Sequence, residues 1–407
     1  MDITLHKSLI NKKTSVEITG SKSESNRLLL LQALFSEIEL KNVSNSDDSN
    51  LMTKALASED EVIDIHHAGT AMRFLTAFFA SKAGRDTILT GSKRMKERPI
   101  KILVDALREL GADISYMEND GFPPIKIKGK QLLKNKVSLK ANVSSQYISA
   151  LLLIASKLNN GIELTLEGEI TSVPYINMTL SLLNEIGVST SFEGNIIKVF
   201  PLSQNIQSKT LTVESDWSSA SYYFSIAAIS EVGTEITLSS YKEHSLQGDS
   251  CLVDIYAHFG VSSTFKDNTI TLRKETSELK PLVLDLKNAP DIAQTIAVTC
   301  FALGIPCDLS GLHTLKIKET DRLVALKTEI EKLGGEVDIT DKSLHLKASN
   351  SINEMVSIAT YNDHRMAMAF APIALKKDLI IEDAGVVSKS YPTFWEDLKS
   401  IGFSITE

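Results

Sequence analysis

Six polar clusters in this chain each precede an apolar run with helical spacing. They occupy residues 21–27, 67–73, 144–149, 216–221, 290–295 and 362–368. Ser, Thr, Asn and Asp in such places commonly cap helices. Several clusters also carry a cation (Lys22, Arg27, Arg73 and Arg365), which capping does not require and which the helix dipole disfavours at this end. We therefore interpret the clusters as helix N-termini that bind anions.

Further cations stand outside these clusters. Residues 93–99 form a basic run, which by itself is typical of a solvated loop. Lys318 and Arg322 open another predicted helix and lie one turn apart on the same face, which by itself is typical of surface ion pairing. Lys389 precedes a Tyr-Pro turn. Only together with the six clusters do these cations indicate a site for anions.

The charge and the motifs restrict the kind of ligand. Lys plus Arg number 43 against 51 Asp plus Glu, a formal charge of -8, so no overall attraction to a nucleic acid is expected. A small anion responds to local charge instead. Neither a GxGxxG, Walker A, HExxH or GxSxG motif nor a metal-binding or disulfide spacing of the three cysteines is present. We expect a small anionic ligand, no cofactor and no metal.

A helix end, a glycine and a strand-like alternation follow one another five times, at intervals of about 70 residues. The glycines are Gly111, Gly187, Gly260, Gly334 and Gly402. Glycine suits the left-handed position at a helix C-terminus, and the alternation after it is typical of a β-hairpin.

The repeats predict how the chain divides into domains. The fifth repeat runs out of chain, and residues 3–18 supply strands of the missing kind, so we predict that both chain ends share one domain. The polar clusters count six units, of which the first lacks its glycine and hairpin. We therefore predict two domains of three units each, residues 1–20 plus 215–407 and residues 21–214.

Length and composition agree with two globular domains. The chain has 407 residues, of which 43% are hydrophobic and 23% charged. Its first residues lack the apolar core of a signal peptide, and no apolar stretch is long enough for a bilayer span. We expect a cytoplasmic protein.

Eight short signatures lie in order along nearly the whole chain. They are GSKSESNR (20–27), AGTAMR (68–73), RMKERP (94–99), SSQ (144–146), SVPY (172–175), PD (290–291), KETDR (318–322) and YNDHRMAM (361–368). Together they resemble the family of 5-enolpyruvylshikimate-3-phosphate synthases (3-phosphoshikimate 1-carboxyvinyltransferases). The resemblance implies an α/β fold, a two-domain inside-out α/β barrel of the enolpyruvyl transferase type. Each domain would hold three βαβαββ-like units, with the first truncated and the active site in the interdomain cleft.

The resemblance also implies the activity. The family transfers the enolpyruvyl group of phosphoenolpyruvate to the 5-hydroxyl of shikimate 3-phosphate through a tetrahedral intermediate and releases phosphate. This step of the shikimate pathway leads to chorismate and the aromatic amino acids. It needs no cofactor or metal, and we expect a monomer whose partners are the two small substrates, with no nucleic acid or membrane.

The matching positions carry the family's roles by analogy. Those expected to bind shikimate 3-phosphate are Lys22, Ser23, Arg27, Ser144, Ser145, Gln146, Ser172, Tyr175, Asp291 and Lys318. Those expected to bind phosphoenolpyruvate are Lys22, Gly69, Arg98, Gln146, Arg322, Arg365 and Lys389. Asp291 is expected to be the base and Glu319, with Lys22, the proton donor, with the division of these roles left open.

Three departures from the family pattern leave alternatives open. His67 replaces a usual Asn, Phe74 a usual Pro, and Thr314 an Asn found in some members. We expect that the bulky Phe74 could displace Gly69 and alter the phosphoenolpyruvate pocket. The alternatives are a catalytically impaired anion-binding paralogue and, with less support, a UDP-N-acetylglucosamine enolpyruvyl transferase, whose Arg-Cys loop has no counterpart among the cysteines of this chain.

Overall fold

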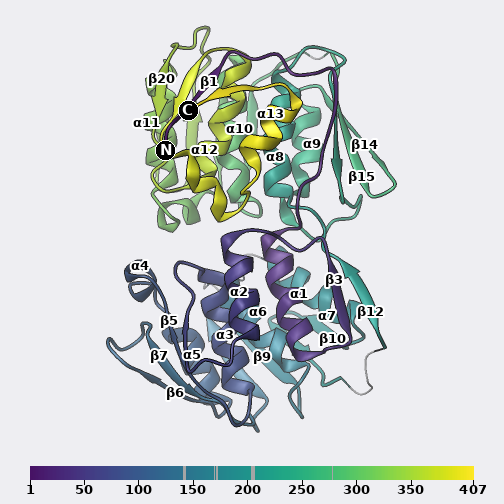
Figure 1. The fold of residues 1–407 in the computed structure, drawn as a ribbon, viewed down its shortest axis with the longest axis vertical. Helices are drawn as coiled ribbons and strands as arrows, with labels where there is room; N and C mark the ends of the chain where they lie inside the picture. Colours follow the sequence, from purple (N-terminus) through teal and green to yellow (C-terminus); the bar gives the residue numbers. More distant parts are fainter. Residues whose placement is uncertain (141–143, 169, 171–172, 203–206, 277) are drawn as a thin grey trace. The chain divides into compact units, whose positions relative to one another are not determined.

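The apolar runs after the six polar clusters all form helices, as predicted. They are α1 (Lys22–Leu34), α3 (Gly69–Ser81), α6 (Ser145–Ala155), α8 (Trp217–Ile229), α10 (Ala293–Leu303) and α12 (His364–Phe370). In α3, α8 and α10 nearly every residue is buried. A helix that is apolar on all sides belongs in a core, so these helices form the interior and the sheets lie outside them (Figure 1).

The computed structural model describes residues 1–140, 144–168, 170, 173–202, 207–276 and 278–407. These residues divide into two compact units, Met1–Thr19 with Glu214–Glu407, and Gly20–Val213. We call them the terminal unit and the central unit. Each division falls one residue before the crossing that the sequence predicted.

In its described residues, the central unit contains three sheets. The strand orders are β4-β5-β7-β6, β10-β11-β9-β8 and β12-β3. The strands are β3 (Ile38–Lys41), β4 (Val62–Asp64), β5 (Asp86–Thr90), β6 (Asp113–Tyr116), β7 (Ile125–Lys128), β8 (Lys136–Lys140), β9 (Ile162–Glu167), β10 (Thr190–Glu193), β11 (Ile196–Val199) and β12 (Lys209–Thr212). The remaining helices of this unit are α2 (Asp47–Ala57), α4 (Lys93–Lys96), α5 (Lys101–Glu109) and α7 (Val173–Glu185).

The terminal unit also contains three sheets. The strand orders are β20-β21-β1-β22, β14-β15-β13-β2 and β16-β17-β19-β18. The strands are β1 (Ile3–His6), β2 (Lys13–Val16), β13 (Glu235–Ser239), β14 (Val261–Lys266), β15 (Thr269–Lys274), β16 (Leu282–Asp285), β17 (Cys307–Ser310), β18 (Val337–Ile339), β19 (Leu344–Leu346), β20 (Val356–Ile358), β21 (Leu379–Ile381) and β22 (Ser404–Thr406). The remaining helices are α9 (Leu252–Ala257), α11 (Arg322–Lys332) and α13 (Phe394–Ile401), with 3-10 turns at Gly248–Cys251, Pro290–Ile292, His313–Ile317, Ala371–Leu375 and Ala384–Lys389.

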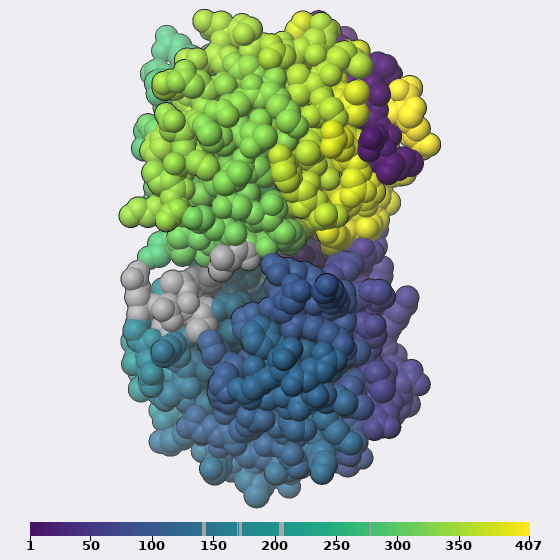
Figure 2. All heavy atoms as spheres, turned by 90° about the vertical axis from the view of Figure 1, so that its left-hand side faces the viewer, coloured from purple at the N-terminus to yellow at the C-terminus, as the bar shows by residue number. Residues whose placement is uncertain are grey.

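The two ends of the chain pair with each other. Strand β1 lies antiparallel to β22, with Leu5 opposite Ile405, and β2 lies parallel to β13. Figure 2 shows the first residues, in purple, beside the last residues, in yellow, on one side of the terminal unit. The last hairpin therefore completes its sheet with a strand from the start of the chain.

The five glycine repeats match the five four-stranded sheets. Each repeat glycine has a positive φ, from 72° at Gly260 to 118° at Gly402, and leads into the strand β6, β10, β14, β18 or β22. This left-handed backbone confirms the predicted role of the glycines. The sixth sheet, β12-β3, has two strands. Its strand β3 lies in the first of the six sequence repeats, the one that lacks the glycine and the hairpin.

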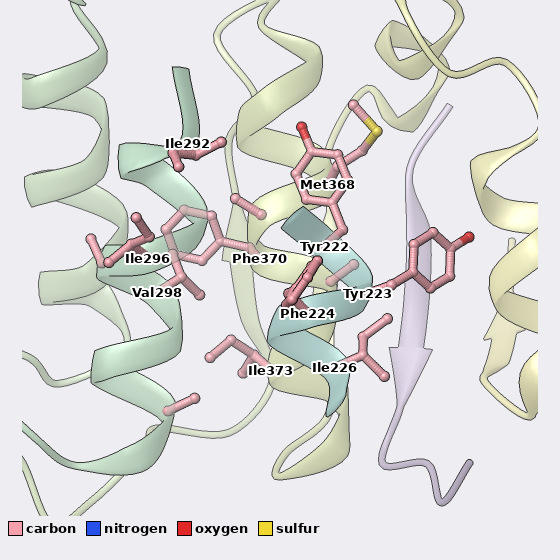
Figure 3. Packing of buried hydrophobic residues seen from close by; sticks show 14 of the residues in the cluster. Tyr222, Tyr223, Phe224, Ile226, Ile292, Ile296, Val298, Met368, Phe370 and Ile373 are labelled. Carbon is pink, nitrogen blue, oxygen red and sulfur yellow. The ribbon is translucent and has the colours of Figure 1, made fainter. Parts of the chain in front are cut away.

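The core of the terminal unit joins its three interior helices. Figure 3 shows side chains of α8, α10 and α12 meeting there, among them Phe224, Ile296 and Phe370, each of which is fully buried. Such a core fixes the relative positions of the N-termini of these helices, where the polar clusters lie. Among the described residues, no helix is both long and apolar enough to span a bilayer.

Candidate active site

Helices α1 and α3 of the central unit, like α5, begin without a side-chain cap. Helix α1 starts at Lys22 and α3 at Gly69, and neither Ser21 nor Ala68 accepts a capping hydrogen bond with its side chain. Within the described part of the chain, the half-buried ammonium of Lys22 has no hydrogen-bond or ion-pair partner. Uncapped N–H groups and an unpaired cation at one helix end favour an anion.

Arg27 lies one turn further along α1 and is buried. Its Nε donates to Thr179 Oγ1 at 2.8 Å, its Nη2 to Ser149 Oγ at 2.9 Å, and its Nη1 to the carbonyl oxygen of Ser23 at 2.6 Å. Burial lowers the pKa of Arg27 to about 10, against the opposing influence of Tyr175 and Glu24. The guanidinium therefore braces α1 against α6 and α7.

Phe74 supports this guanidinium from α3. The Cζ atom of Arg27 lies 5.6 Å from the centre of the Phe74 ring and 5.9 Å from that of the Tyr175 ring, within the range of cation–π attraction. Phe74 is fully buried. Helix α3 starts at Gly69, and further along it the Phe74 ring packs beside the Arg27 guanidinium.

Three expected phosphoenolpyruvate residues meet at the start of α3. A Cβ added to Gly69 would lie 2.5 Å from Arg98 Nη1, so the guanidinium rests on the glycine backbone. Gln146 Nε2, from α6, donates to Thr70 Oγ1 at 3.1 Å. Among the residues that the structure describes, the side chain of Arg98 has no ion-pair partner, and this leaves its charge available to a ligand.

The loop that carries Arg98 is held in place by Arg73. Arg73 Nη2 donates to the carbonyl oxygen of Pro99 at 3.1 Å, and Nη1 to that of Gly69 at 3.0 Å. The hydroxyl of Tyr147 donates to the same Pro99 carbonyl at 2.7 Å. Arg73 is 4% exposed, so its guanidinium holds neighbouring backbone in place and is not open to solvent. Part of the predicted basic loop forms α4, because Ser92 caps it by accepting from the N–H of Met95.

The other central-unit predictions fall around α6 and α7. Ser144 caps α6 by accepting from the N–H of Gln146 at 3.4 Å, and Ser145 is its first residue. Tyr175 lies in the first turn of α7. Ser172 lies outside the described residues. His67, just before α3, has its Nε2 atom 4.0 Å from Asp47 Oδ2.

In the terminal unit, Arg322 gathers three carboxylates. Its Nε donates to Asp363 at 2.6 Å, its Nη1 to Asp291 at 2.8 Å and its Nη2 to Glu319 at 2.8 Å. Arg322 is 2% exposed. Burial alone would lower the pKa of Arg322, but the three carboxylates together raise it. The guanidinium thus fixes both expected proton-transfer carboxylates.

The helix predicted to contain both Lys318 and Arg322 begins only at Arg322. Asp321 takes the capping position and accepts from the N–H groups of Leu323 and Val324, which prevents an earlier start. The prediction that Lys318 and Arg322 lie one helical turn apart on one face is therefore wrong. Both side chains nevertheless form an ion pair with Asp291 Oδ1: Lys318 Nζ lies 3.4 Å from it and Arg322 Nη1 lies 2.8 Å from it.

Asp291 is surrounded by cations. Besides Lys318 and Arg322, Arg365 Nη2 lies 3.3 Å from Asp291 Oδ2. Burial alone would lower the pKa of Arg365, but Asp291 and other neighbouring acidic groups raise it well above its usual value. Asp363 caps α12 by accepting from the N–H of Arg365 at 2.9 Å. Lys389 Nζ donates to the carbonyl oxygen of Asn362 at 2.6 Å, next to this cap.

Ser218 and Asp249 complete the cluster, and the sequence analysis did not single out either of them. Ser218 Oγ donates to Asp249 Oδ2 and accepts from Arg365 Nη2 at 3.3 Å. Burial, and then the charge of Asp291, raise the pKa of Asp249 to about 6. Ser218 lies within the polar cluster 216–221, which could have indicated it. Asp249 belongs to no cluster or repeat.

Each unit thus contains part of the set of expected site residues. The central unit supplies uncapped helix ends with Lys22 and Arg98, and the terminal unit supplies carboxylates fixed among Arg322, Arg365 and Lys318. Donors held in place by a fold stabilise charge that develops during a reaction. In the described part of the chain, no group of three His, Cys, Asp or Glu side chains is placed to hold a metal ion.

Comparison with known proteins identifies the family. The sequence model of the EPSP synthase (3-phosphoshikimate 1-carboxyvinyltransferase) family matches residues 54–398. A 3-phosphoshikimate 1-carboxyvinyltransferase of Bacteroides fragilis is 48% identical over 398 residues, which are 97% of this chain and 96% of that protein. A protein of the same name from Histophilus somni is 36% identical over 95% of this chain and 96% of its own.

Solved structures share the fold. The EPSP synthase of Acinetobacter baumannii superposes with a TM-score of 0.83 over 100% of both chains, at 20% identity. The enolpyruvyl transferase NikO of Streptomyces tendae gives a TM-score of 0.74 over 100% of this chain and 98% of its own, at 12% identity. These findings confirm the predicted fold class and family: the chain belongs to the EPSP synthase (3-phosphoshikimate 1-carboxyvinyltransferase) family.

Proposed function

We propose that the protein transfers the enolpyruvyl group of phosphoenolpyruvate to the 5-hydroxyl of shikimate 3-phosphate and releases phosphate. The names of its relatives, at up to 48% identity over nearly the whole chain, support this assignment. The observation that carries it is the carboxylate cluster of the terminal unit, where Asp291 and Glu319 share Arg322. Binding an anion alone would not require two carboxylates fixed beside its cations.

Asp291 and Glu319 are proposed as the proton-transfer groups. In the addition step, the 5-oxygen bonds to C2 of phosphoenolpyruvate, its proton passes to Asp291, and Glu319, with Lys22, protonates the C3 methylene. In the elimination step the roles reverse: Glu319 takes a proton from C3, the bond from C2 to the phosphate oxygen breaks, and the proton held by Asp291 passes to the departing phosphate. General acid–base catalysis of this kind contributes roughly 10²–10⁴-fold in rate.

The substrate-binding residues are divided between the units. The residues proposed for shikimate 3-phosphate are Lys22, Ser23, Arg27, the 144–146 segment, Ser172 and Tyr175 in the central unit, and Asp291 and Lys318 in the terminal unit. The proposed phosphoenolpyruvate residues are Gly69, Arg98 and Gln146 in the central unit and Arg322, Arg365 and Lys389 in the terminal unit, with Lys22 serving both substrates. Each unit holds part of this set.

Phosphate release tests the assignment. Purified protein is given phosphoenolpyruvate alone, with shikimate 3-phosphate, or with UDP-N-acetylglucosamine. Release only with shikimate 3-phosphate, at least a hundredfold slower in Asp291→Asn, is the expected result. Release with UDP-N-acetylglucosamine would assign the related transferase instead. A folded protein that releases phosphate with neither acceptor would be the impaired paralogue.

A further inference from the structure

The turn before α12 holds two successive residues in a left-handed conformation. Tyr361 and Asn362 both have a φ of 55°. Asn tolerates this region because its short side chain can bond locally, whereas a bulky aromatic residue rarely adopts it. Such a backbone persists only where surrounding contacts determine it. The contacts that hold this turn therefore bear on the position of the residues that follow it.

Helix α11 supplies these contacts through Glu329. Its carboxylate is fully buried; Oε1 accepts from the hydroxyl of Tyr361 at 2.6 Å, and Oε2 accepts from the N–H of Ala359 at 3.2 Å. Lys332 Nζ, at 2.8 Å, balances the charge. Burial, with Glu329 nearby, raises the pKa of Tyr361 to about 12, so at neutral pH the hydroxyl keeps the proton that it donates.

The same helix holds the other end of the turn. Arg322 precedes Glu329 by seven residues, about two helical turns, so both side chains lie on one face of α11. Arg322 binds Asp363, and Lys389 binds the carbonyl oxygen of Asn362. The turn from Ala359 to Asp363 is thus fixed on α11 at both ends.

This turn determines where the cations of α12 begin. Asp363 caps the helix through the N–H of Arg365, and the side chain of Arg365 reaches Asp291. If the two left-handed residues relaxed to an ordinary conformation, Asp363 and Arg365 would shift together. A buried carboxylate is costly to desolvate, and an apolar side chain would fill the same space at lower cost. The buried carboxylate of Glu329 therefore serves to hold the turn, because packing alone would not require a charged side chain there.

We propose that Glu329 is a positioning residue, which holds the left-handed Tyr361–Asn362 turn and through it places Arg365 and Asp363 for phosphoenolpyruvate. The proposal rests on the proposed function for the identity of the ligand. Glu329 itself contacts neither Asp291 nor Arg365 in the hydrogen bonds and ion pairs of the described residues. It would therefore act on the proton-transfer carboxylates only indirectly, through Arg365 and Asp363.

The test combines hydrogen exchange with kinetics in the full-length protein. Glu329→Ala removes both acceptors, Glu329→Gln keeps an uncharged acceptor, and Tyr361→Phe removes a single hydroxyl from a partly exposed residue. Glu331→Ala is the matched control, because Glu331 lies on the same helix and, among the residues that the structure describes, its carboxylate pairs only with Lys327. Exchange is measured for the peptide that spans residues 356–368.

The expected result is local and larger for one substrate. Glu329→Ala should exchange faster between residues 359 and 365 and raise KM for phosphoenolpyruvate about tenfold, with a much smaller rise in KM for shikimate 3-phosphate. Tyr361→Phe should raise KM for phosphoenolpyruvate about threefold, because it loses one hydrogen bond. The KM of Glu329→Gln should lie between those of Tyr361→Phe and Glu329→Ala. Glu331→Ala should match the wild type in both readouts.

Three results would overturn the proposal. They are unchanged exchange in Glu329→Ala, faster exchange over the whole terminal unit, and equal rises in both KM values. If Glu329→Ala does not fold, Tyr361→Phe decides by the same criteria. If the wild type does not release phosphate, the proposed function fails, and local exchange still decides whether Glu329 holds the turn.

Discussion

Asp249 offers a test of the electrostatics around the carboxylate cluster. It is 8% exposed and bonds to Ser218, which in turn bonds to Arg365. Burial, followed by the charge of Asp291, raises the pKa of Asp249 from 3.8 to about 6. Replacing Asp249 by Asn keeps an oxygen acceptor for Ser218 and removes the charge. The variant therefore isolates the free energy of holding a carboxylate ion in this place.

The size of this free energy follows from the shift. About two pKa units correspond to about 3 kcal/mol. The folded state binds the proton of Asp249 more tightly than the unfolded state does. The resulting contribution to the free energy of unfolding is therefore fully present below the unfolded pKa of about 3.9. It is lost as pH rises through the folded pKa of about 6. By linkage, about 2 kcal/mol of it disappears between about pH 4.5 and about pH 7.5.

Tryptophan fluorescence can report this change in one unit alone. The chain has two tryptophans, Trp217 and Trp395, and both are buried in the terminal unit. Urea unfolding of the wild type and Asp249→Asn is followed at both pH values. The stability gap between them should shift in favour of the variant by about 2 kcal/mol at the higher pH, roughly 1 M in urea midpoint.

The pH dependence, and not the size of the gap at one pH, decides the outcome. A new hydrogen-bond mismatch at the substituted position would add a constant offset, which cancels in the comparison of the two pH values. Asp254→Asn, at an exposed position on α9, is the control and should show no such shift. A gap between wild type and Asp249→Asn that stays constant from about pH 4.5 to about pH 7.5 would refute a raised pKa at Asp249.

Three further predictions concern the central unit and the carboxylates. Gly69→Ala places a Cβ 2.5 Å from Arg98 Nη1; the guanidinium should move away and KM for phosphoenolpyruvate rise about tenfold, and an unchanged KM in steady-state assays would contradict the contact. Phe74→Ala removes a fully buried ring and should lower stability by about 3–5 kcal/mol in calorimetry, whereas a loss below about 1 kcal/mol would deny its support of Arg27. Asp291→Asn should lower kcat about a hundredfold or more while phosphoenolpyruvate still binds in calorimetric titration; turnover at the wild-type rate would exclude Asp291 as the base.

The sequence determined those features that depend on neighbours along the chain. Apolar spacing and polar caps located the six helix starts, because a helix buries residues three and four apart. The five repeat glycines predicted the left-handed helix ends, because only glycine takes that backbone freely. The ordered signatures were specific enough to indicate the family, which the comparisons confirmed.

The tertiary structure decided which side chains meet. Arg322 collects carboxylates from positions 291, 319 and 363, and neither this convergence nor the helix start that excludes Lys318 follows from local spacing. Arg27 is expected from the sequence to bind a substrate, and its burial among hydroxyls and carbonyls does not follow from local spacing. Asp249 belongs to no sequence motif or repeat, and its raised pKa comes from burial and then from the charge of Asp291, which is distant along the chain. Periodicity reports the local backbone, whereas contacts and desolvation arise only when remote segments pack together.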